Sequence, residues 1–364
     1  MCSLRSLGRA FWWFQKTEVI PINLLGLSKE SLIGLTAAMG QPAYRAAQLM
    51  DWLYSKGTPD LQAMTDLPRS LRENLISGGY TVELPQENTR FQAPDGTVKF
   101  LFTLSDGQQV ETVYIPEGPR HTICLSTQVG CGMGCLICAT GRTGLVRNLQ
   151  AGEIIGQVLK VQKLVSVRIT NVVIMGQGEP LANYEATVTA LNLCGADHGM
   201  GIAARHLALS TCGLPGGIVR LAEEGRQWRL TVSLHAACNE LRDKLMPINR
   251  RYPLQVLKKA CADYCNISGR RITFAYVLIS GVNDRAAEAR AVAGFCEGLS
   301  AHINLIPWNM VPGVDLAPPG GEKVALFRQW LEDAGVNATI RRPRGAEFNA
   351  ACGQLRADLL EAGK

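Results

Sequence analysis

The stretch Cys131-Gly-Met-Gly-Cys135-Leu-Ile-Cys138 places three cysteines within eight residues at CxxxCxxC spacing. Thiolates are soft ligands that suit iron–sulfur clusters or zinc. A closed structural zinc site needs four ligands, usually from paired CxxC units. Three thiolates from one short loop better suit a [4Fe–4S] cluster whose fourth iron stays open to a substrate. The spacing therefore predicts a reactive cluster, and a zinc half-site completed from elsewhere is the alternative.

The composition is that of an ordinary globular chain, with 364 residues, 47% hydrophobic and 19% charged. This length allows one large domain and a small one. No apolar run reaches the roughly 18 residues of a membrane helix, and the first twenty residues lack a signal-peptide cleavage site. Twelve cysteines spread through so large a chain indicate a reducing cytoplasm rather than a disulfide scaffold. A net charge of +6 permits a nucleic-acid partner without requiring one.

Strand and helix patterns alternate from about residue 120 onward, which predicts a parallel sheet with covering helices. An example is residues 152–164, where Ile154, Ile155, Val158 and Val161 share one helix face. The pattern alone does not distinguish an open sheet from a barrel. Before this region, residues 27–82 have helical patterns and residues 89–115 have strand patterns with a hairpin signal. The candidate strands of the alternating region are Thr122–Ser126, Asn171–Met175, His206–Ser210, Leu230–Leu234, Ile272–Ile279, Ile303–Ile306 and Ala338–Arg341.

Polar and glycine-rich motifs follow these strands where each one ends. Because chemistry in such folds gathers at the carboxyl ends of the strands, we expect the motifs to share one pocket. Each motif alone is weak evidence for a functional site. Their occurrence at the ends of successive strands strengthens that prediction. In chain order they are Cys131–Cys138, Gly176-Gln-Gly-Glu179-Pro180, Ser210-Thr-Cys-Gly213, Ser233-Leu-His235, Asn309 and Cys352.

Taken in order, the motifs resemble the RlmN/Cfr group of radical S-adenosylmethionine (SAM) RNA methyltransferases, over about residues 27–356. The resemblance implies an α/β fold: a partial (βα) barrel of the radical SAM type with a small N-terminal helical accessory domain. The implied organisation is an unplaced extension (1–20), the helical accessory domain (21–88), a β-hairpin linker (89–116), the barrel (117–346) and a tail with Cys352 (347–364). The stretches that carry the resemblance are Val110–Glu117, Cys124–Cys131, Arg147–Leu149, Met175–Pro180, Ser233–Ala236, Met246–Asn249, Gly281–Asp284, Ile303–Asn309 and Ala350–Leu355.

The resemblance also implies a role for each site residue. Cys131, Cys135 and Cys138 would hold one [4Fe–4S] cluster. Cys352 would become methylated, Cys124 would be its redox partner, and Glu111 would accept a proton. The residues expected to contact SAM are Gly178, Glu179, Ser210, Ser233, Leu234, His235 and Asn309.

The implied reaction uses two SAM molecules per turnover. One methylates the Cys352 thiolate by displacement. The second yields a radical that activates this methyl group, which then joins the substrate base to Cys352. Loss of a ring proton and attack by Cys124 release the product and leave a Cys124–Cys352 disulfide.

The implied substrates are 23S rRNA and tRNA, whose target base must leave its stack to reach a recessed pocket. Ile306-Pro-Trp-Asn309 resembles the branch that methylates adenine C2, and C8 methylation of the same rRNA base (the Cfr type, which confers antibiotic resistance) is the alternative. The resemblance further implies a cytoplasmic monomer with no membrane partner and a flavodoxin-like or ferredoxin-like reductant. Basic residues, including Arg45, Arg69, Arg72 and Arg147 with Arg342 and Arg344 farther along the chain, are candidate phosphate ligands.

One position departs from the resemblance: Gln177 stands where a methionine is usual, and we expect its side chain to face away with little effect. Two other classes compete with the methyltransferase hypothesis. One is an iron–sulfur RNA-binding protein without catalysis, against which Cys124 and Cys352 argue. The other is a radical SAM enzyme that acts on a small molecule or peptide, against which the N-terminal helices and the Ala350–Leu355 tail argue.

Overall fold

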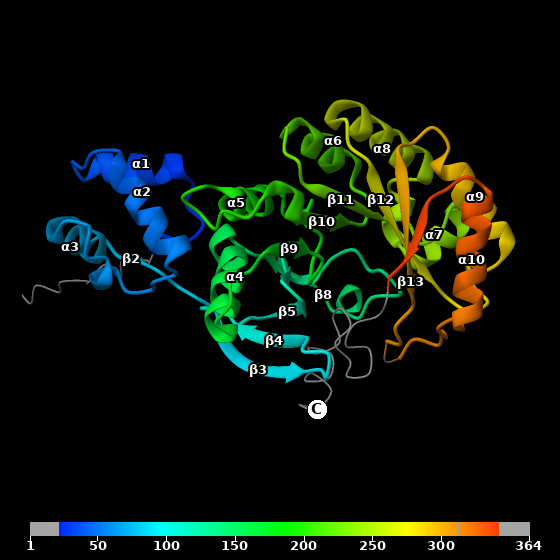
Figure 1. The fold of residues 1–364 in the computed structure, drawn as a ribbon, viewed down its shortest axis with the longest axis horizontal. Helices are drawn as coiled ribbons and strands as arrows, with labels where there is room; N and C mark the ends of the chain where they lie inside the picture. The colour runs from blue at the N-terminus through cyan, green and yellow to red at the C-terminus, as the bar shows by residue number, and fades with distance from the viewer. Residues whose placement is uncertain (1–21, 312, 342–364) are drawn as a thin grey trace, which may run out of the picture.

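A ten-stranded sheet is the main element of the computed structural model, which describes residues 22–311 and 313–341 (Figure 1). Seven of its strands run parallel: β6 (Arg120–Leu125), β9 (Asn171–Ile174), β10 (Leu207–Thr211), β11 (Arg229–Ser233), β12 (Ile272–Leu278), β13 (Ala301–Pro307) and β14 (Ala338–Ile340). Three antiparallel strands extend it: β3 (Gln86–Gln92), β4 (Val98–Thr103) and β5 (Gln109–Glu117). The order β14-β13-β12-β11-β10-β9-β6-β5-β4-β3 leaves β14 and β3 as its edges.

The seven parallel strands confirm the seven strands that the sequence predicts, with ends that differ by only a few residues. The predicted helix at 152–164 is also present as α4, and its start is fixed by a capping box between Gln150 and Glu153. The helices that connect the strands are α4 (Ala151–Val165), α5 (Tyr184–Gly195), α6 (Pro215–Glu223), α7 (Asn239–Leu245), α8 (Leu254–Ser268), α9 (Ala286–Cys296) and α10 (Gly321–Asp333).

Strand residues alternate between two faces of the sheet, as the pleat requires. Val172, Ile174, Leu207 and Leu209 belong to the main hydrophobic cluster, which also contains residues of α4, α5, α6 and α8. Their neighbours point the other way and lie outside that cluster. We call this second face the inner face, and it carries Cys124, Val173, Ala208 and Ser210.

The helices expected between residues 27 and 82 form a small bundle at one end of the molecule (Figure 1). The bundle contains α1 (Lys29–Ala38), α2 (Tyr44–Met50), a π turn η1 (Asp51–Ser55), a 3-10 turn η2 (Leu61–Ala63) and α3 (Arg69–Ser77). Ser28 caps α1 by accepting a bond from the Ser31 amide at 3.1 Å. A short parallel pair, β1 (Ile22–Asn23) with β2 (Tyr80–Thr81), closes the bundle and was not predicted.

The bundle meets the barrel at a contact between two glycines. Gly26 has φ +90°, and a Cβ there would lie 2.3 Å from the Gly152 amide nitrogen; a Cβ on Gly152 would lie 2.3 Å from the Leu25 carbonyl oxygen. The Gly26 amide also donates to the Tyr54 hydroxyl at 3.1 Å. Only glycine allows backbones to approach this closely. None of the helices in the described ranges is long and apolar enough to cross a membrane.

Substituting Gly152 by alanine should destabilise the protein by about 1–3 kcal/mol, because the new methyl group has nowhere to go without moving the Leu25 backbone. Urea denaturation measures this free energy of unfolding. The matched control is Gly294→Ala in α9, where a Cβ meets no atom within 4 Å; this change should stabilise by about 0.5–1 kcal/mol. Equal stability of Gly152→Ala and the natural protein would show that the contact yields easily.

Candidate active site

Cys131 ends strand β7 (Gln128–Cys131), and Cys135 and Cys138 lie in the loop that joins it to β8 (Gly144–Asn148); the two strands are antiparallel and lie beside the sheet. Gly130 allows the hairpin to close, because it has φ +74° and a Cβ there would lie 2.0 Å from the Gly144 carbonyl oxygen. The Leu136 amide donates to the Leu245 carbonyl at 3.0 Å. The loop thereby packs on a second hydrophobic cluster, which includes Ala139, Cys212, Leu245, Met246, Ile279 and Trp308.

The three thiols lie close enough to influence one another electrostatically. Burial is the main cause that raises the pKa of the Cys131 thiol to about 11 and that of the Cys135 thiol to about 12, and the neighbouring thiols add to both shifts. A bound metal centre would reverse this preference, since cysteine binds iron or zinc as the thiolate and releases its proton.

The donor set fits a [4Fe–4S] cluster better than a single ion. A single zinc ion holds all its ligands around one point and in a structural site needs four of them, whereas this segment supplies three thiolates. Thiolates that bind a [4Fe–4S] cluster each take a different iron, so they need not meet at one point.

The loop from Gly176 to Pro180 follows β9 and is pressed against the chain that leads into the cysteine hairpin. Gly178 has φ +100°, and a Cβ there would lie 2.6 Å from the Gln128 side chain. The Glu179 amide donates to Gln128 Oε1 at 2.8 Å. The loop expected to contact SAM and the hairpin expected to hold the cluster are thus fixed to each other.

Glu179 is buried and its carboxylate is already engaged by the protein. It accepts bonds from Thr211 Oγ1 (2.7 Å), the Cys212 amide (2.7 Å) and the Leu181 amide (3.0 Å). Burial raises the pKa of this carboxyl, and these hydrogen bonds oppose the rise. The side chain therefore fastens the β9 loop to the end of β10, a role that the motif alone did not predict.

His235 follows β11 in an unusual left-handed conformation, φ 56°. Its Nδ1 accepts a bond from the Val277 amide at 3.0 Å, so the proton of the neutral ring lies on Nε2. Burial, helped by the nearby Arg242 cation, lowers the pKa of His235 to about 3. The imidazole is consequently neutral at physiological pH and offers one N–H donor of fixed direction.

The other expected SAM contacts also lie at strand ends. Ser210 is the fourth residue of β10, Ser233 ends β11, and Leu234 follows it, with an amide bond to the Ala275 carbonyl at 2.9 Å. Asn309 comes two residues after β13 and is partly buried. The carboxyl edge of the sheet therefore brings together the residues that the sequence places there, except Cys352, which lies outside the described residues.

Arg242 of α7 is a site residue that the sequence analysis missed. Its side chain is 1% exposed. The guanidinium donates to the carbonyls of Cys212 (2.8 Å), Ser233 (3.1 Å) and Leu234 (3.1 Å) and to Asn249 Oδ1 (3.0 Å). It thus binds the ends of β10 and β11 together, as the planar fork of arginine allows.

The same cation also acts on the cysteine loop, since it lowers the pKa of Cys135 against the larger effect of burial. Arg242 stands in the polar stretch Asn239-Glu-Leu-Arg-Asp-Lys, which has the appearance of an exposed helix surface. No signal in that stretch distinguishes it from a solvated arginine.

Gln177 corrects an expectation, because its side chain does not face away. It is 2% exposed, and its Oε1 accepts a bond from the Glu111 amide at 3.2 Å. Ser126 completes the arrangement: its hydroxyl donates to the Glu111 carbonyl at 2.6 Å and accepts from the Gln177 amide at 2.9 Å. β6 ends beside Glu111, so the backbone of Glu111 has no strand partner on that side. The side chains of Gln177 and Ser126 supply the hydrogen bonds instead.

Glu111 and Cys124 lie on neighbouring strands, β5 and β6, and both are buried. Glu111 Oε1 lies 3.5 Å from Nζ of Lys99, a lysine of β4 that is 1% exposed. The sequence analysis did not single out Lys99, which stands in a strand pattern that gives no sign of burial.

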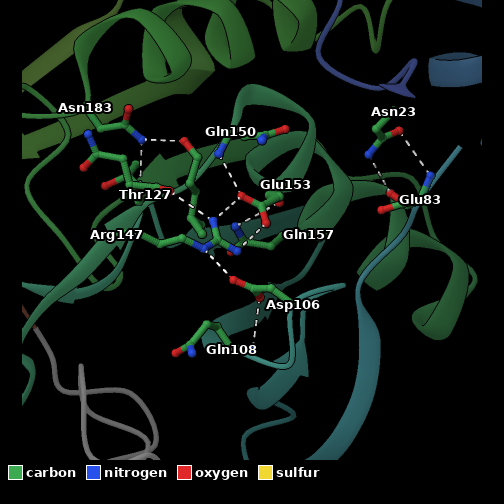
Figure 2. A network of polar contacts seen from close by, with 12 residues as sticks. Asn23, Glu83, Asp106, Gln108, Thr127, Arg147, Gln150, Glu153, Gln157 and Asn183 are labelled. Carbon is green, nitrogen blue, oxygen red and sulfur yellow. Dashed lines mark hydrogen bonds and ion pairs between the residues drawn. The ribbon is translucent and has the colours of Figure 1, made fainter. Parts of the chain in front are cut away.

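Arg147 is committed to two carboxylates, as Figure 2 shows. It bonds to Asp106 through Nε (2.7 Å) and to both oxygens of Glu153 (2.7 and 2.8 Å). These bonds raise the pKa of Arg147 and lower that of Asp106. Arg147 therefore connects the β4–β5 turn to the start of α4, and both carboxylates would have to release it before it could bind a phosphate. Arg342 and Arg344 lie outside the described residues.

Comparisons with known proteins agree with this arrangement. Residues 22–78 match the family model of the ribosomal RNA large subunit methyltransferase N-terminal domain, and residues 125–291 match that of the radical SAM superfamily. The crystal structure of a radical SAM methyltransferase from Sphaerobacter thermophilus has a TM-score of 0.87 and 44% identity, over 93% of this chain and 100% of that one. The fold is thus the partial (βα) barrel of the radical SAM class, with an N-terminal helical domain.

Full-length relatives narrow the class. The "Dual-specificity RNA methyltransferase RlmN" of Anaeromyxobacter dehalogenans is 44% identical over 92% of both chains. The "Probable dual-specificity RNA methyltransferase RlmN" of Symbiobacterium thermophilum is 45% identical over 92% of this chain and 91% of its own. The chain belongs to the RlmN family of radical SAM methyltransferases.

Replacing Gln177 by methionine should destabilise the protein by about 1–3 kcal/mol, because the buried Glu111 amide loses its acceptor. The free energy of unfolding in urea checks this. Gln329→Met, on the exposed face of α10, is the matched control and should change stability by less than about 0.5 kcal/mol. Equal effects of the two changes would contradict the role assigned to Gln177.

His235 should make stability depend on pH below neutrality. The unfolded chain binds a proton at this residue below about pH 6.5, but the folded protein does so only near the lowered pKa of about 3. Stability from the neutral ring is therefore complete above pH 6.5 and is lost as pH falls, by about 2 kcal/mol at pH 5.

His235→Asn is the control, since asparagine tolerates positive φ and keeps an acceptor for the Val277 amide without titrating. Unfolding in urea at pH 7 and pH 5 should show the natural protein losing about 2 kcal/mol more than the variant. Equal losses of stability in the natural protein and in His235→Asn would mean that His235 is not buried as described.

Proposed function

We propose that this chain methylates C2 of adenine 2503 in 23S rRNA and of adenine 37 in tRNA, through a methylated Cys352 and two SAM molecules per turnover. The observation that carries the proposal is the position of Cys124 and Glu111. Both are buried on adjacent strands next to the cysteine and glycine-rich loops. An electron-transfer cluster needs neither a further thiol nor a further carboxylate there. The full-length relatives are named dual-specificity RNA methyltransferases, which supports RNA as the substrate.

Each part of the site has a task in this proposal. Cys131, Cys135 and Cys138 would hold the cluster, which supplies the single electron for cleaving SAM. The neutral His235 ring presents its Nε2 proton to SAM, while the Arg242 guanidinium keeps the ends of β10 and β11 in place around it. The remaining chemistry belongs to the two thiols and the glutamate.

The thiol chemistry requires Cys352 and Cys124 to act in turn. The Cys352 sulfur takes a methyl group from SAM by displacement. The carbon of this methyl group later forms the bond that joins the substrate base to the enzyme. Glu111 takes the proton from the ring carbon. The Cys124 thiolate then attacks the Cys352 sulfur, so that the S–S bond forms as the bond from that sulfur to the transferred carbon breaks; this carbon leaves with the base, takes up a proton and becomes the methyl group, and the one electron introduced by SAM cleavage is given back. A flavodoxin-like or ferredoxin-like protein is the proposed source of electrons.

We place part of the RNA contact on the helical accessory domain (21–88), whose match to a ribosomal RNA methyltransferase domain supports this role. Exposed basic residues of the bundle, such as Arg69 on α3, would meet phosphates. Arg69 pairs with Glu73 in the free protein, an exposed contact that phosphate can replace at little cost.

Mass spectrometry of nucleosides tests the reaction. The protein, with its cluster rebuilt without oxygen, is given SAM, a reductant and protein-free 23S rRNA or tRNA. We expect 2-methyladenosine from both RNAs. The Cfr-type product, 8-methyladenosine, would contradict the C2 assignment, and SAM cleavage with no methylated base would contradict the RNA substrate.

Cys352→Ala should abolish methyl transfer, a loss of at least about 1,000-fold as expected for a missing nucleophile, while SAM cleavage continues. Cys265→Ala in α8, far along the chain from the strand-end motifs, is the matched control and should retain activity. Methylation that survives Cys352→Ala would overturn the proposed mechanism.

A further inference from the structure

A buried lysine shares the inner face with the two groups just assigned to product release. Lys99 of β4 is the register partner of Val113 in β5, and Val113 is the register partner of Cys124 in β6. Register partners in antiparallel strands point to the same side of a sheet. Glu111 lies two residues before Val113 and points to that side as well. Three adjacent strands therefore present an ammonium, a carboxylate and a thiol on one face.

This face is not the one that builds the core. Phe100, Phe102, Val110 and Ile123 of the same strands belong to the main hydrophobic cluster, whereas Lys99, Glu111 and Cys124 do not. The ion pair is therefore not a by-product of core packing, since it lies on the inner face, and Glu111 is bonded there to Gln177 of the Gly176–Pro180 loop.

Burying both charges is costly for folding. The side chain of Lys99 is 1% exposed and that of Glu111 is 4% exposed, with 3.5 Å between Nζ and Oε1. Taking two ions out of water costs several kcal/mol each, and apolar residues of similar size at such positions are often neutral or better for stability. Stability alone gives no reason for a lysine at this position, so function is the better explanation.

The backbone of Glu111 is already fixed, because Gln177 and Ser126 bind its amide and carbonyl at 3.2 and 2.6 Å. These contacts set where the side chain begins. At its other end, the ammonium of Lys99 pairs with the carboxylate, with 3.5 Å between Nζ and Oε1.

We propose that Lys99 is a positioning residue for product release: its ammonium holds the Glu111 carboxylate on the inner face beside Cys124, ready to receive the proton of the substrate base. The inference rests on the proposed function. In the step concerned, a proton passes from the ring carbon to a Glu111 oxygen, and the electron pair of the broken C–H bond stays with the ring. Lys99 neither gains nor loses a proton.

The test separates bond formation from release. Lys99→Met and Lys99→Arg are compared with the natural protein, each with the cluster rebuilt and given SAM, reductant and protein-free 23S rRNA. We expect Lys99→Met to lower the yield of methylated adenosine at least tenfold, while SAM cleavage and Cys352 methylation persist. RNA joined covalently to the protein should then accumulate on denaturing gels, as it should for Glu111→Gln. Lys99→Arg, which keeps the cation, should restore most of the yield.

Two outcomes would overturn the proposal: full turnover by Lys99→Met, or loss of product without any covalent RNA–protein species while SAM is still cleaved. The second outcome would mean that Lys99 acts before the base is joined to Cys352. Failure of the natural protein to methylate RNA would instead count against the proposed function, so the two failures are distinguishable.

A denaturation measurement tests the pairing without any activity. Lys99→Met leaves a buried carboxylate without its ammonium and should lower the urea midpoint. The double variant Lys99→Met/Glu111→Leu, which removes both charges, should recover most of that loss yet release no product. A double variant no more stable than Lys99→Met would show that the two residues are not coupled and would overturn the proposal.

Discussion

The site depends on satisfying backbone groups where the parallel strands end. Strands that pair along their length part at the carboxyl edge, and each carbonyl or amide left there needs a partner because it is buried. In this chain the partners are side chains. Arg242 binds carbonyls of two strand ends, Glu179 binds the Cys212 amide, and Gln177 with Ser126 binds both backbone groups of Glu111.

Two of these side chains, Glu179 and Arg242, also set the electrostatics of this edge of the sheet. Glu179 brings a buried carboxylate to the thiols and raises the pKa of Cys131 and Cys135, while Arg242 brings a cation that lowers that of Cys135. Opposite charges thus act on the same cysteine loop. An anionic centre assembled on that loop would be stabilised by the arginine and destabilised by the glutamate. The relative strength of these two effects would therefore set the stability of that centre.

The repetitive parts of this fold could be predicted from sequence. Alternation of apolar residues gave all seven parallel strands and helix α4, and the strand-end rule placed Gly178, Ser210, Ser233 and His235 at one edge. The same rule could not find Arg242 or Lys99, since a charged residue is usually solvated and its burial depends on tertiary contacts. Gln177 was misread for a related reason: the direction of a loop side chain follows from what surrounds the loop. The β1–β2 pair was missed because two residues per strand leave no periodic signal.

The contact between Gly26 and Gly152 has a consequence for how this protein can vary. The segment before α1 touches the first turn of α4, and Glu153 in that turn binds Arg147 of β8, a strand of the cysteine hairpin. A change in the backbone path of the bundle would therefore shift the cysteine hairpin, because only a few residues separate the two. The accessory domain and the barrel are therefore joined at one close backbone contact, and a chimera that exchanges the bundle between relatives should fold only where both glycines and the backbone path between them are kept.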